Sequence, residues 1–484
     1  MPVSRLRSRL TDFACCLCLT IFFSATSPAQ VTTGTITGTV SDANGQSVAG
    51  AQVTITDVSK NTTAQFATND AGEYTAPFLV PSTYEVAIEK TGFKRLVRSG
   101  VVLQVDQTAR IDATMEVGEI SETTTVIGGA PLVNTEDAGI GEVIEERPIR
   151  ELPLNGRNFA TLVYLVPGVT PGQAGENLSG ASTFNPRGAS NFNALGHHAN
   201  SNAWLIDGID NNEYTFNTVI VTPSIESVRE FKVLTGTFSA EFGRGAGVVS
   251  VSTKSGSNDF HGTLFEFLRN DVFDARNYFA PRQTVPKKPP FRRNQYGFAL
   301  SGPLTLPRFG EGGPRIWSGK NKTFIFGDYA GLREIRGLTF VNTVPTAKTR
   351  VGDFSEYINP RTGQLVPIYN PYTTRPDPNN PGRFIRDPFP GNIIPSQLLN
   401  QVGLNVASIY PLPNGPGNFD NYTSTANRVV TDDAISLRGD HKFGEHDSLF
   451  VRYNYGSFKL DAPQGQAACC LPTPAEAASR FDLG

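Results

Sequence analysis

The segment from Ile225 to Gly262 constrains the fold more than any other part of the chain. Apolar and polar side chains alternate over 230–233 and again over 249–252. A period of two is typical of β-strands, whose successive side chains point to opposite faces. Glycine occupies every second position from Gly243 to Gly247, and a residue without a Cβ lets another backbone approach closely or the chain turn. We therefore expect a tightly packed, buried sheet in this segment.

Length and composition indicate several mainly β domains. A chain of 484 residues holds about three domains of roughly 100–200 residues each. The 47 glycines and 34 prolines indicate many turns. The net charge is only −3 and 18% of the residues are charged, so the composition does not indicate nucleic-acid binding.

The N-terminus has the pattern of an export signal. Three arginines between Arg5 and Arg9 precede an apolar stretch over 13–25, and small residues follow as far as Ala29. The stretch is shorter than the ~20 apolar residues that a spanning helix needs, so we expect a secretory signal peptide over 1–29.

Three of the five cysteines lie inside this predicted signal peptide. The other two, Cys469 and Cys470, are adjacent, and a bridge between neighbouring residues is strained. The sequence therefore predicts no disulfide framework, and whether these two thiols stay free or pair with other thiols stays open.

Residues 32–117 alternate short β runs with turn signals, and apolar residues such as Val53 and Ile55 recur with a period of two. This pattern predicts a small N-terminal β-sandwich of the immunoglobulin-like or prealbumin-like kind. The alternation stops over 118–131, where we expect a linker. Residues 132–258 combine strand signals with a turn and a short helix that ends before Pro167, which predicts an α+β domain.

From residue 259 the strands become longer and alternate by face. Leu449, Val451, Tyr453 and Tyr455 lie opposite polar neighbours such as Arg452. This alternation is typical of a membrane barrel with an apolar outside, but a soluble sandwich shows the same pattern. Residues 345–430 contain thirteen prolines and predict a long loop outside the membrane.

No arrangement of residues predicts catalysis, a cofactor site or a metal site. His197 and His198 lie in a Gly- and Asn-rich stretch, where exposed loop residues are the simpler interpretation. Asp207, Asp210 and Asn212 lack the glycine and the final glutamate of a calcium loop, so a turn is favoured. The glycines from Gly243 onward lack the lysine of a phosphate-binding loop. We expect no enzyme.

Several segments resemble known families. One resemblance is to the plug domain of TonB-dependent outer-membrane receptors, in particular the Oar-like group. It lies in the segments SAEFGRGAG, VVSVSTKSGSNDFHG, LPLNGRNF and LVPGV. The wording GTVSDANGQSVAGAQVTIT resembles the carboxypeptidase regulatory-like domain, whose name implies no peptidase activity. The segments VPTAKTRVGDFS and PFPGNIIPSQ resemble the surface segment of Oar-like proteins.

The resemblance implies a fold and a set of domains. It implies a plug domain over 132–258, followed over 259–484 by the first strands of a transmembrane β-barrel. Barrels of this class close about twenty-two strands, whereas the residues after Asn258 supply only about five credible ones. We therefore expect an incomplete barrel and a chain that is truncated at its C-terminal end.

The resemblance also implies a partner in the inner membrane. One short run resembles a TonB box, the extended peptide that a TonB-type energy-coupling protein captures as an added strand. Its residues are Glu122, Thr123, Thr124, Thr125, Val126 and Ile127. An ordinary last strand of the preceding sandwich is the equally weighted alternative.

The resemblance implies a receptor in the cell outer membrane, in contact with its lipid, that takes up an unidentified extracellular ligand. The alternative is a secreted or surface β-sandwich protein that binds carbohydrate or protein without transport. A band of lipid-facing aromatic residues favours the receptor, and exposed aromatic residues on the sandwich favour the alternative.

Overall fold

The computed structural model describes residues 33–119, 123–127, 139–154, 156–172, 192–198, 201–213, 218–238, 242, 246–278, 288–307, 316–444, 447–462 and 479–483. The predicted signal peptide and the cysteines at 469 and 470 lie outside these residues. The chain divides into two compact units, Met1–Gly262 with Leu300–Gly327 and Ser436–Tyr453, and Thr263–Ala299 with Asp328–Ile435 and Asn454–Gly484. In the described part of the chain, every helix is too short or too polar to cross a membrane.

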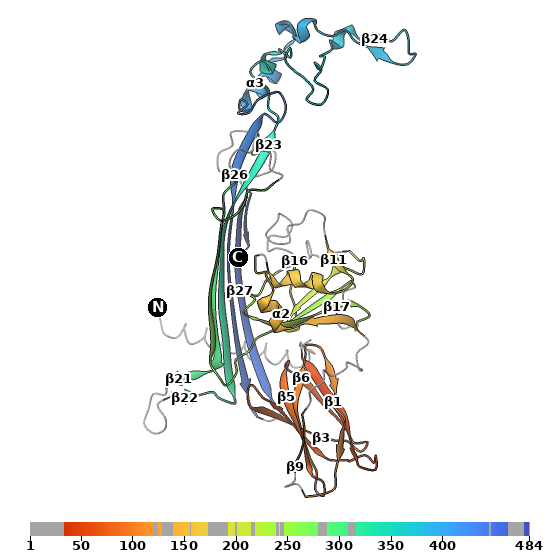
Figure 1. The fold of residues 1–484 in the computed structure, drawn as a ribbon, viewed down its shortest axis with the longest axis vertical. Helices are drawn as coiled ribbons and strands as arrows, with labels where there is room; N and C mark the ends of the chain where they lie inside the picture. Colours follow the sequence, from red (N-terminus) through yellow and green to blue (C-terminus); the bar gives the residue numbers. More distant parts are fainter. Residues whose placement is uncertain are drawn as a thin grey trace, which may run out of the picture. The chain divides into compact units, whose positions relative to one another are not determined.

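The first unit begins with the predicted β-sandwich, and Figure 1 labels β1, β3, β5, β6 and β9 among its strands. One sheet has the order β4 (Glu73–Leu79), β1 (Gly34–Asp42), β7 (Thr108–Arg110), and β8 (Ala113–Met115) also pairs with β1. The other has the order β3 (Thr62–Ala67), β2 (Gln52–Asp57), β5 (Ser82–Glu89), β6 (Arg95–Leu103), β9 (Thr123–Ile127). Apolar side chains from both sheets, including Ile36, Val53 and Ile88, form one buried core. The period of two therefore places one face of each sheet inside, which confirms the predicted sandwich.

The second part of the first unit is the predicted α+β domain, built on a five-stranded mixed sheet. Its order is β10 (Ile140–Ile144), β17 (Val228–Gly236), β18 (Val248–Thr253), β13 (Ala203–Ile206), β14 (Ile209–Asp210). Strands β17 and β18 are the two alternating runs predicted from the sequence. Every residue of β18 is buried, including Ser250 and Ser252, so the sheet is covered on both faces.

Short elements cover this sheet. Helix α2 (Glu146–Glu151) contacts β17, and the 3₁₀ helix η2 (Phe159–Leu165) packs its apolar side chains into the same core. Two small ribbons follow, β11 (Val169–Pro171) with β12 (Phe192–Ala194) and β15 (Asn212–Glu213) with β16 (Thr218–Val219). The predicted turn and short helix before Pro167 are confirmed as η2.

One of the predicted glycine positions has a clear packing role. A Cβ on Gly247 would lie 2.9 Å from the Phe192 ring and 3.0 Å from the Cβ of Ala194, so only glycine lets these segments approach. Gly243 and Gly245 lie outside the described residues. The close approach at Gly247 is therefore one of side chains, not of another backbone as the sequence predicted.

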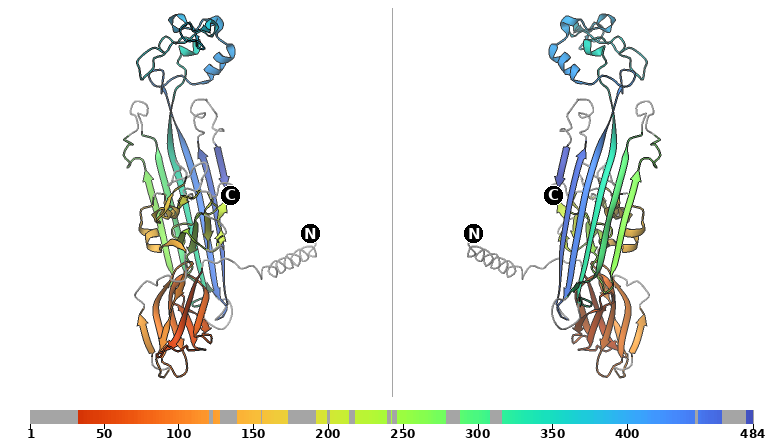
Figure 2. Two further views of the ribbon diagram at one scale, coloured as in Figure 1. Left: turned by 90° about the vertical axis from the view of Figure 1, so that its right-hand side faces the viewer. Right: turned by 90° about the vertical axis from the view of Figure 1, so that its left-hand side faces the viewer.

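A six-stranded sheet follows, and Figure 2 shows its strands side by side. Its order is β19 (His261–Asn270), β20 (Phe291–Pro303), β23 (Thr323–Asn342), β26 (Tyr422–Lys442), β27 (Ser448–Ala462), β28 (Ser479–Leu483). A separate ribbon pairs β21 (Thr305–Pro307) with β22 (Ile316–Ser318). Along β26, Leu437 is 50% exposed whereas Ser436 and Arg438 are each 6% exposed. The predicted alternation of apolar and polar faces is confirmed.

The proline-rich segment of the second unit contains short elements. These are η5 (Thr349–Val351), η6 (Pro371–Thr373), β24 (Arg375–Pro376), β25 (Phe384–Ile385), η7 (Pro390–Asn392), η8 (Ser396–Leu398) and α3 (Gln401–Ile409). Strand β26 begins at Tyr422, so the loop is shorter than the predicted range of 345–430. The residues from Tyr422 to Val430 contain no proline and can donate all their backbone hydrogen bonds to the sheet.

Candidate functional site

The candidate coupling peptide is the outermost strand of a sandwich sheet. Strand β9 runs parallel to β6, with Thr123 opposite Arg95 and Ile127 opposite Ser99. Thr123 and Thr125 are exposed, and Glu122 lies outside the described residues. The peptide therefore occupies the position of a last sandwich strand, and it is also an edge strand that can exchange partners.

A turn of the sandwich lies against the five-stranded sheet of the same unit. The turn joins β6 to β7, and the backbone N–H of Val105 donates to Oε1 of Glu230 on β17 at 2.5 Å. The Lys232 ammonium donates to the carbonyl oxygen of Asp106 at 2.8 Å. Gln104 donates to Glu145, just before α2, at 3.1 Å. These three contacts join the two domains.

Glu230 has an unusual electrostatic environment at this junction. Burial raises the pKa of its carboxyl to about 7, although the hydrogen bond from Val105 and the charge of Arg229 oppose the shift. The negative charges of Glu145 and Asp106 add to it. A carboxylate that loses water without gaining a full counter-charge holds its proton more strongly, so the charge of this contact changes near neutral pH.

A buried carboxylate links the plug-like domain to two strands of the six-stranded sheet. Asp207 occupies the turn after β13 and is 4% exposed. Its Oδ2 accepts hydrogen bonds from Arg452 on β27 at 2.6 Å and from Arg438 on β26 at 3.5 Å. Thr253 at the end of β18 donates its backbone N–H to Oδ1 at 2.9 Å and its hydroxyl to Oδ2 at 2.6 Å. Two guanidinium cations and two neutral donors therefore satisfy this carboxylate. We call Asp207 together with Thr253, Arg438 and Arg452 the Asp207 clamp.

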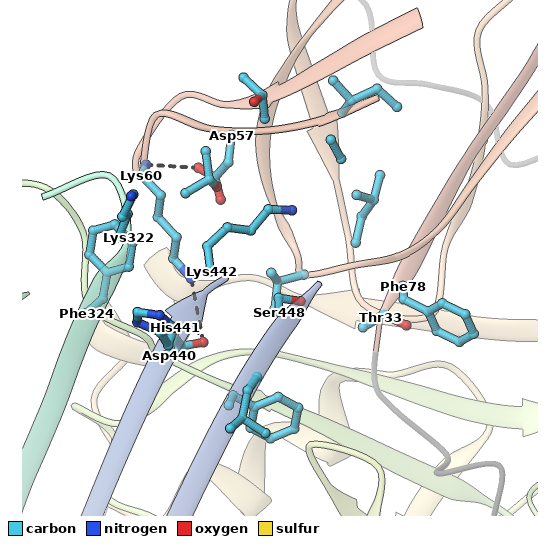
Figure 3. A pocket seen from close by; sticks show the side chains of 18 of the residues that line it. Thr33, Asp57, Lys60, Phe78, Lys322, Phe324, Asp440, His441, Lys442 and Ser448 are labelled. Atoms are coloured by element: carbon cyan, nitrogen blue, oxygen red, sulfur yellow. Dashed lines mark hydrogen bonds and ion pairs between the residues drawn. The ribbon is translucent and has the colours of Figure 1, made fainter. Parts of the chain in front are cut away.

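A second charged contact connects the sandwich to the same strands. The Lys60 ammonium lies 3.7 Å from Oδ1 of Asp440 on β26, and that carboxylate also accepts from Arg438 at 3.0 Å. Figure 3 shows Lys60 reaching toward Asp440 beside His441. Burial lowers the pKa of Lys60, and Asp440 only partly opposes this effect.

The side chains around Lys60 enclose a cavity of about 270 Å³. Charged lining residues are Asp57, Lys60, Asp207, Lys322, Arg438, Asp440 and Lys442, and apolar ones include Phe78 and Phe324. Figure 3 shows Asp57 and Lys60 from the sandwich facing Asp440 and Lys442 at the end of β26. The cavity therefore has a mixed lining, in which charged side chains lie beside apolar ones.

The structure places the other residues that the sequence singled out. His197 and His198 are exposed after β12, and the glycine-rich bend at 243–245 lies outside the described residues. Asp210 accepts from the backbone N–H of Asn212 at 2.9 Å, which is a local turn. Among the described residues, no group of three or more histidine, cysteine, aspartate or glutamate side chains has the arrangement of a metal site.

Sequence reasoning missed the Asp207 clamp. The strand pattern predicted that Arg438 and Arg452 would lie on the polar face, but it gave them no partner. Asp207 lies 231 and 245 residues away from them, and no local pattern encodes a contact over such a separation.

Three family models match the chain. They are a carboxypeptidase regulatory-like domain over 35–116, a TonB-dependent receptor plug domain over 136–249 and an outer membrane β-barrel domain over 252–480. The chain is 28% identical over 250 residues to a TonB-dependent transporter, Oar, of Myxococcus xanthus. That match covers 49% of this chain and 22% of the transporter, so the chain spans about a fifth of its relative.

Solved structures show weak similarity to parts of the chain. The siderophore receptor PirA from Pseudomonas aeruginosa is 13% identical, with a TM-score of 0.28, over 68% of this chain and 44% of that receptor. A putative carbohydrate-binding protein from Bacteroides uniformis is 19% identical, with a TM-score of 0.15, over 17% of this chain and 40% of that protein.

Proposed function

We propose that this chain, which belongs to the TonB-dependent outer-membrane receptors and carries their plug and β-barrel domains, serves in uptake of an extracellular ligand. A TonB-type protein of the inner membrane captures Glu122–Ile127 as an added strand. Its pull displaces part of the plug, and the ligand passes through the space that opens.

One observation supports this mechanism most strongly. The first described strand after the box is β10, which pairs only with β17 and forms one edge of the plug sheet. Of its five residues, only Ile144 is buried. An edge strand with little buried apolar area can leave without opening the rest of the sheet. A pull on the box therefore first reaches an edge strand of the plug with little buried apolar area.

The Asp207 clamp supports the other half of the mechanism. It fixes the turn after β13 and the end of β18 to β26 and β27 through a buried ion pair. Breaking such a pair by loss of one partner costs about 3–5 kcal/mol. The plug is thus held firmly on the side of β13 and β18 and weakly at β10, so partial displacement requires less force than removal of the whole domain.

The exposed side chains of the six-stranded sheet favour the receptor over a secreted binding protein. Val451 is 63% exposed, Tyr453 59% and Phe298 50%, as lipid-facing positions require. Among the described residues of the sandwich, Phe78 is the one aromatic residue with an exposed side chain. The aromatic residues therefore lie where a membrane contact needs them.

A binding experiment tests the role of the box. Val126→Pro removes a backbone donor and fixes φ, so the peptide can no longer complete a strand in another sheet. We expect the periplasmic domain of the TonB-type protein to bind the detergent-solubilised receptor with this variant about tenfold more weakly, a loss of about 1.4 kcal/mol.

Glu119→Pro is the matched control, because it introduces the same residue just before the box and leaves the box sequence intact. It should bind like the unchanged receptor. Equal binding of the Val126→Pro variant and the unchanged receptor would exclude Glu122–Ile127 as the coupling peptide.

A further inference from the structure

The chain before β9 is fixed next to the start of β6. Phe93 and Val117 form a β-bridge, and Lys94 donates its backbone N–H to the carbonyl of Glu116 at 2.8 Å. Gly118 donates to Gly92 at 3.1 Å. The next described residues are those of β9, which follow β6 in parallel from Arg95 onward.

This attachment sets the register of β9. All five residues of β9 have successive partners on β6, from Arg95 with Thr123 to Ser99 with Ile127, without a bulge. Strand β6 pairs with β5 on its other side, so β9 satisfies an edge that would otherwise present unpaired backbone groups to water. Extended peptides that add to a sheet edge use the same backbone groups for affinity.

The backbone N–H and C=O groups of β9 that pair with β6 therefore cannot pair with a second sheet edge at the same time. A strand addition by a partner would occur either at the outer edge of β9, with β9 still in the sandwich, or after β9 has left β6. Thr123 and Thr125 are exposed, so the outer face of β9 contributes little apolar burial to hold it in place.

We infer that the N-terminal sandwich is an autoinhibitory holder of the coupling peptide: β9 is stored on β6, and the energy-coupling partner binds only the released strand. This inference rests on the proposed function of Glu122–Ile127. When the competent state is only partly populated, the apparent affinity falls by the released fraction. The sandwich thereby limits how often the receptor engages its partner, and any event that weakens the β6–β9 pairing raises that frequency.

A reversible cross-link tests the inference. Val97 and Thr125 are direct partners in the middle of the pairing, and neighbouring strands about 4.8 Å apart allow a disulfide between such positions. We would prepare Val97→Cys with Thr125→Cys in a receptor whose Cys469 and Cys470 are serine. The probe is the purified periplasmic domain of the TonB-type protein, and binding is measured on the detergent-solubilised receptor.

We expect the oxidised double variant to lose binding at least tenfold and to recover it after reduction, whereas each single variant binds equally with and without reductant. A synthetic peptide of residues 118–131 should bind at least tenfold more tightly than the unchanged receptor, because no sandwich withholds it. Unchanged binding after oxidation, with the cross-link verified by mass spectrometry, would overturn the inference.

The outcomes separate this inference from the function on which it rests. If Val126→Pro abolishes binding but the cross-link does not, the box is correct and the storage on β6 is wrong. If neither change affects binding, the box itself is wrong, and the storage of β9 has no role in coupling.

Discussion

Asp207 has a side-chain environment that distinguishes it from the other residues of the plug. It is buried, and its carboxylate is shared by Thr253, Arg438 and Arg452. A neutral amide at this position could still accept the threonine bonds but could not balance two buried guanidinium groups. The clamp therefore depends on charge as well as shape.

We predict that Asp207→Asn destabilises the plug by about 3 kcal/mol, the lower range for loss of a partner in a buried ion pair. Urea unfolding can be followed by the fluorescence of Trp204, which is 2% exposed and lies beside the clamp on β13. The exposed Trp317 is replaced by phenylalanine in the unchanged protein and in each variant, so that the tryptophan fluorescence comes from Trp204.

The matched control is Asp210→Asn, the same chemical change at an exposed turn residue. Surface changes of this kind are usually within about 0.5 kcal/mol. Similar unfolding midpoints for the two variants would show that the ion pair does not hold the plug.

Glu230 gives the junction between sandwich and plug a dependence on pH. Its pKa is raised by burial from 4.5 to about 7, so the folded state keeps a proton that the unfolded state loses. The stability that this proton supplies is complete below about pH 4.5 and is lost as the pH rises to about 7. The junction that buries Glu230 should therefore open more readily at pH 8 than at pH 5, because the ionised carboxylate is more stable in water than in this buried site.

We predict that Glu230→Gln removes this dependence, because the amide still accepts from Val105 and carries no charge at either pH. Hydrogen exchange of the Val105 amide, corrected for the intrinsic effect of pH, measures the contact directly. The unchanged protein should lose protection between pH 5 and pH 8, whereas the variant should not. Equal profiles for both proteins would contradict the role assigned to Glu230.

At the scale of the element, the edge strands β9 and β10 differ from the central strands in how they are held. Strand β18 is buried along its whole length between β17 and β13. Strand β10 has one partner and one buried residue. Local opening requires least energy where apolar burial is smallest, so these edge strands are the elements that a pull can move.

The strands also show what a local sequence pattern can predict and what it cannot. The alternation over 230–233 and 249–252 predicted β17 and β18 because a period of two is a local property. It did not predict that Glu230 is buried, since the sandwich turn that covers it lies 125 residues earlier. The parallel pairing of β9 with β6 joins Thr123 to Arg95, and no composition shift in the linker indicates this partner.

Helix α3 was missed for a related reason. Val402, Val406 and Ile409 have the spacing of one helix face, but the helix is short and none of its residues is buried. A capping signal was present, because the side chain of Asn400 accepts from the N–H groups of Val402 and Gly403. The surrounding prolines concealed this signal in a segment that was predicted to be a loop.

At the scale of the whole molecule, the domains have the order that the proposed coupling mechanism requires. The sandwich precedes the plug, the plug precedes the barrel strands, and the proposed box lies between the sandwich and the plug. The central claim is that a pull on the box opens the plug at β10 and leaves the clamped strands in place.

Cysteine accessibility in energised cells tests this claim most directly. Thr235 on β17 is 2% exposed and contacts Ile140 of β10, whereas Ser250 on β18 is fully buried. We predict that Thr235→Cys reacts with a thiol reagent only when the TonB-type partner is active and the box is intact, while Ser250→Cys stays protected. Equal reaction at both positions, or no reaction at Thr235→Cys under coupling, would contradict the account.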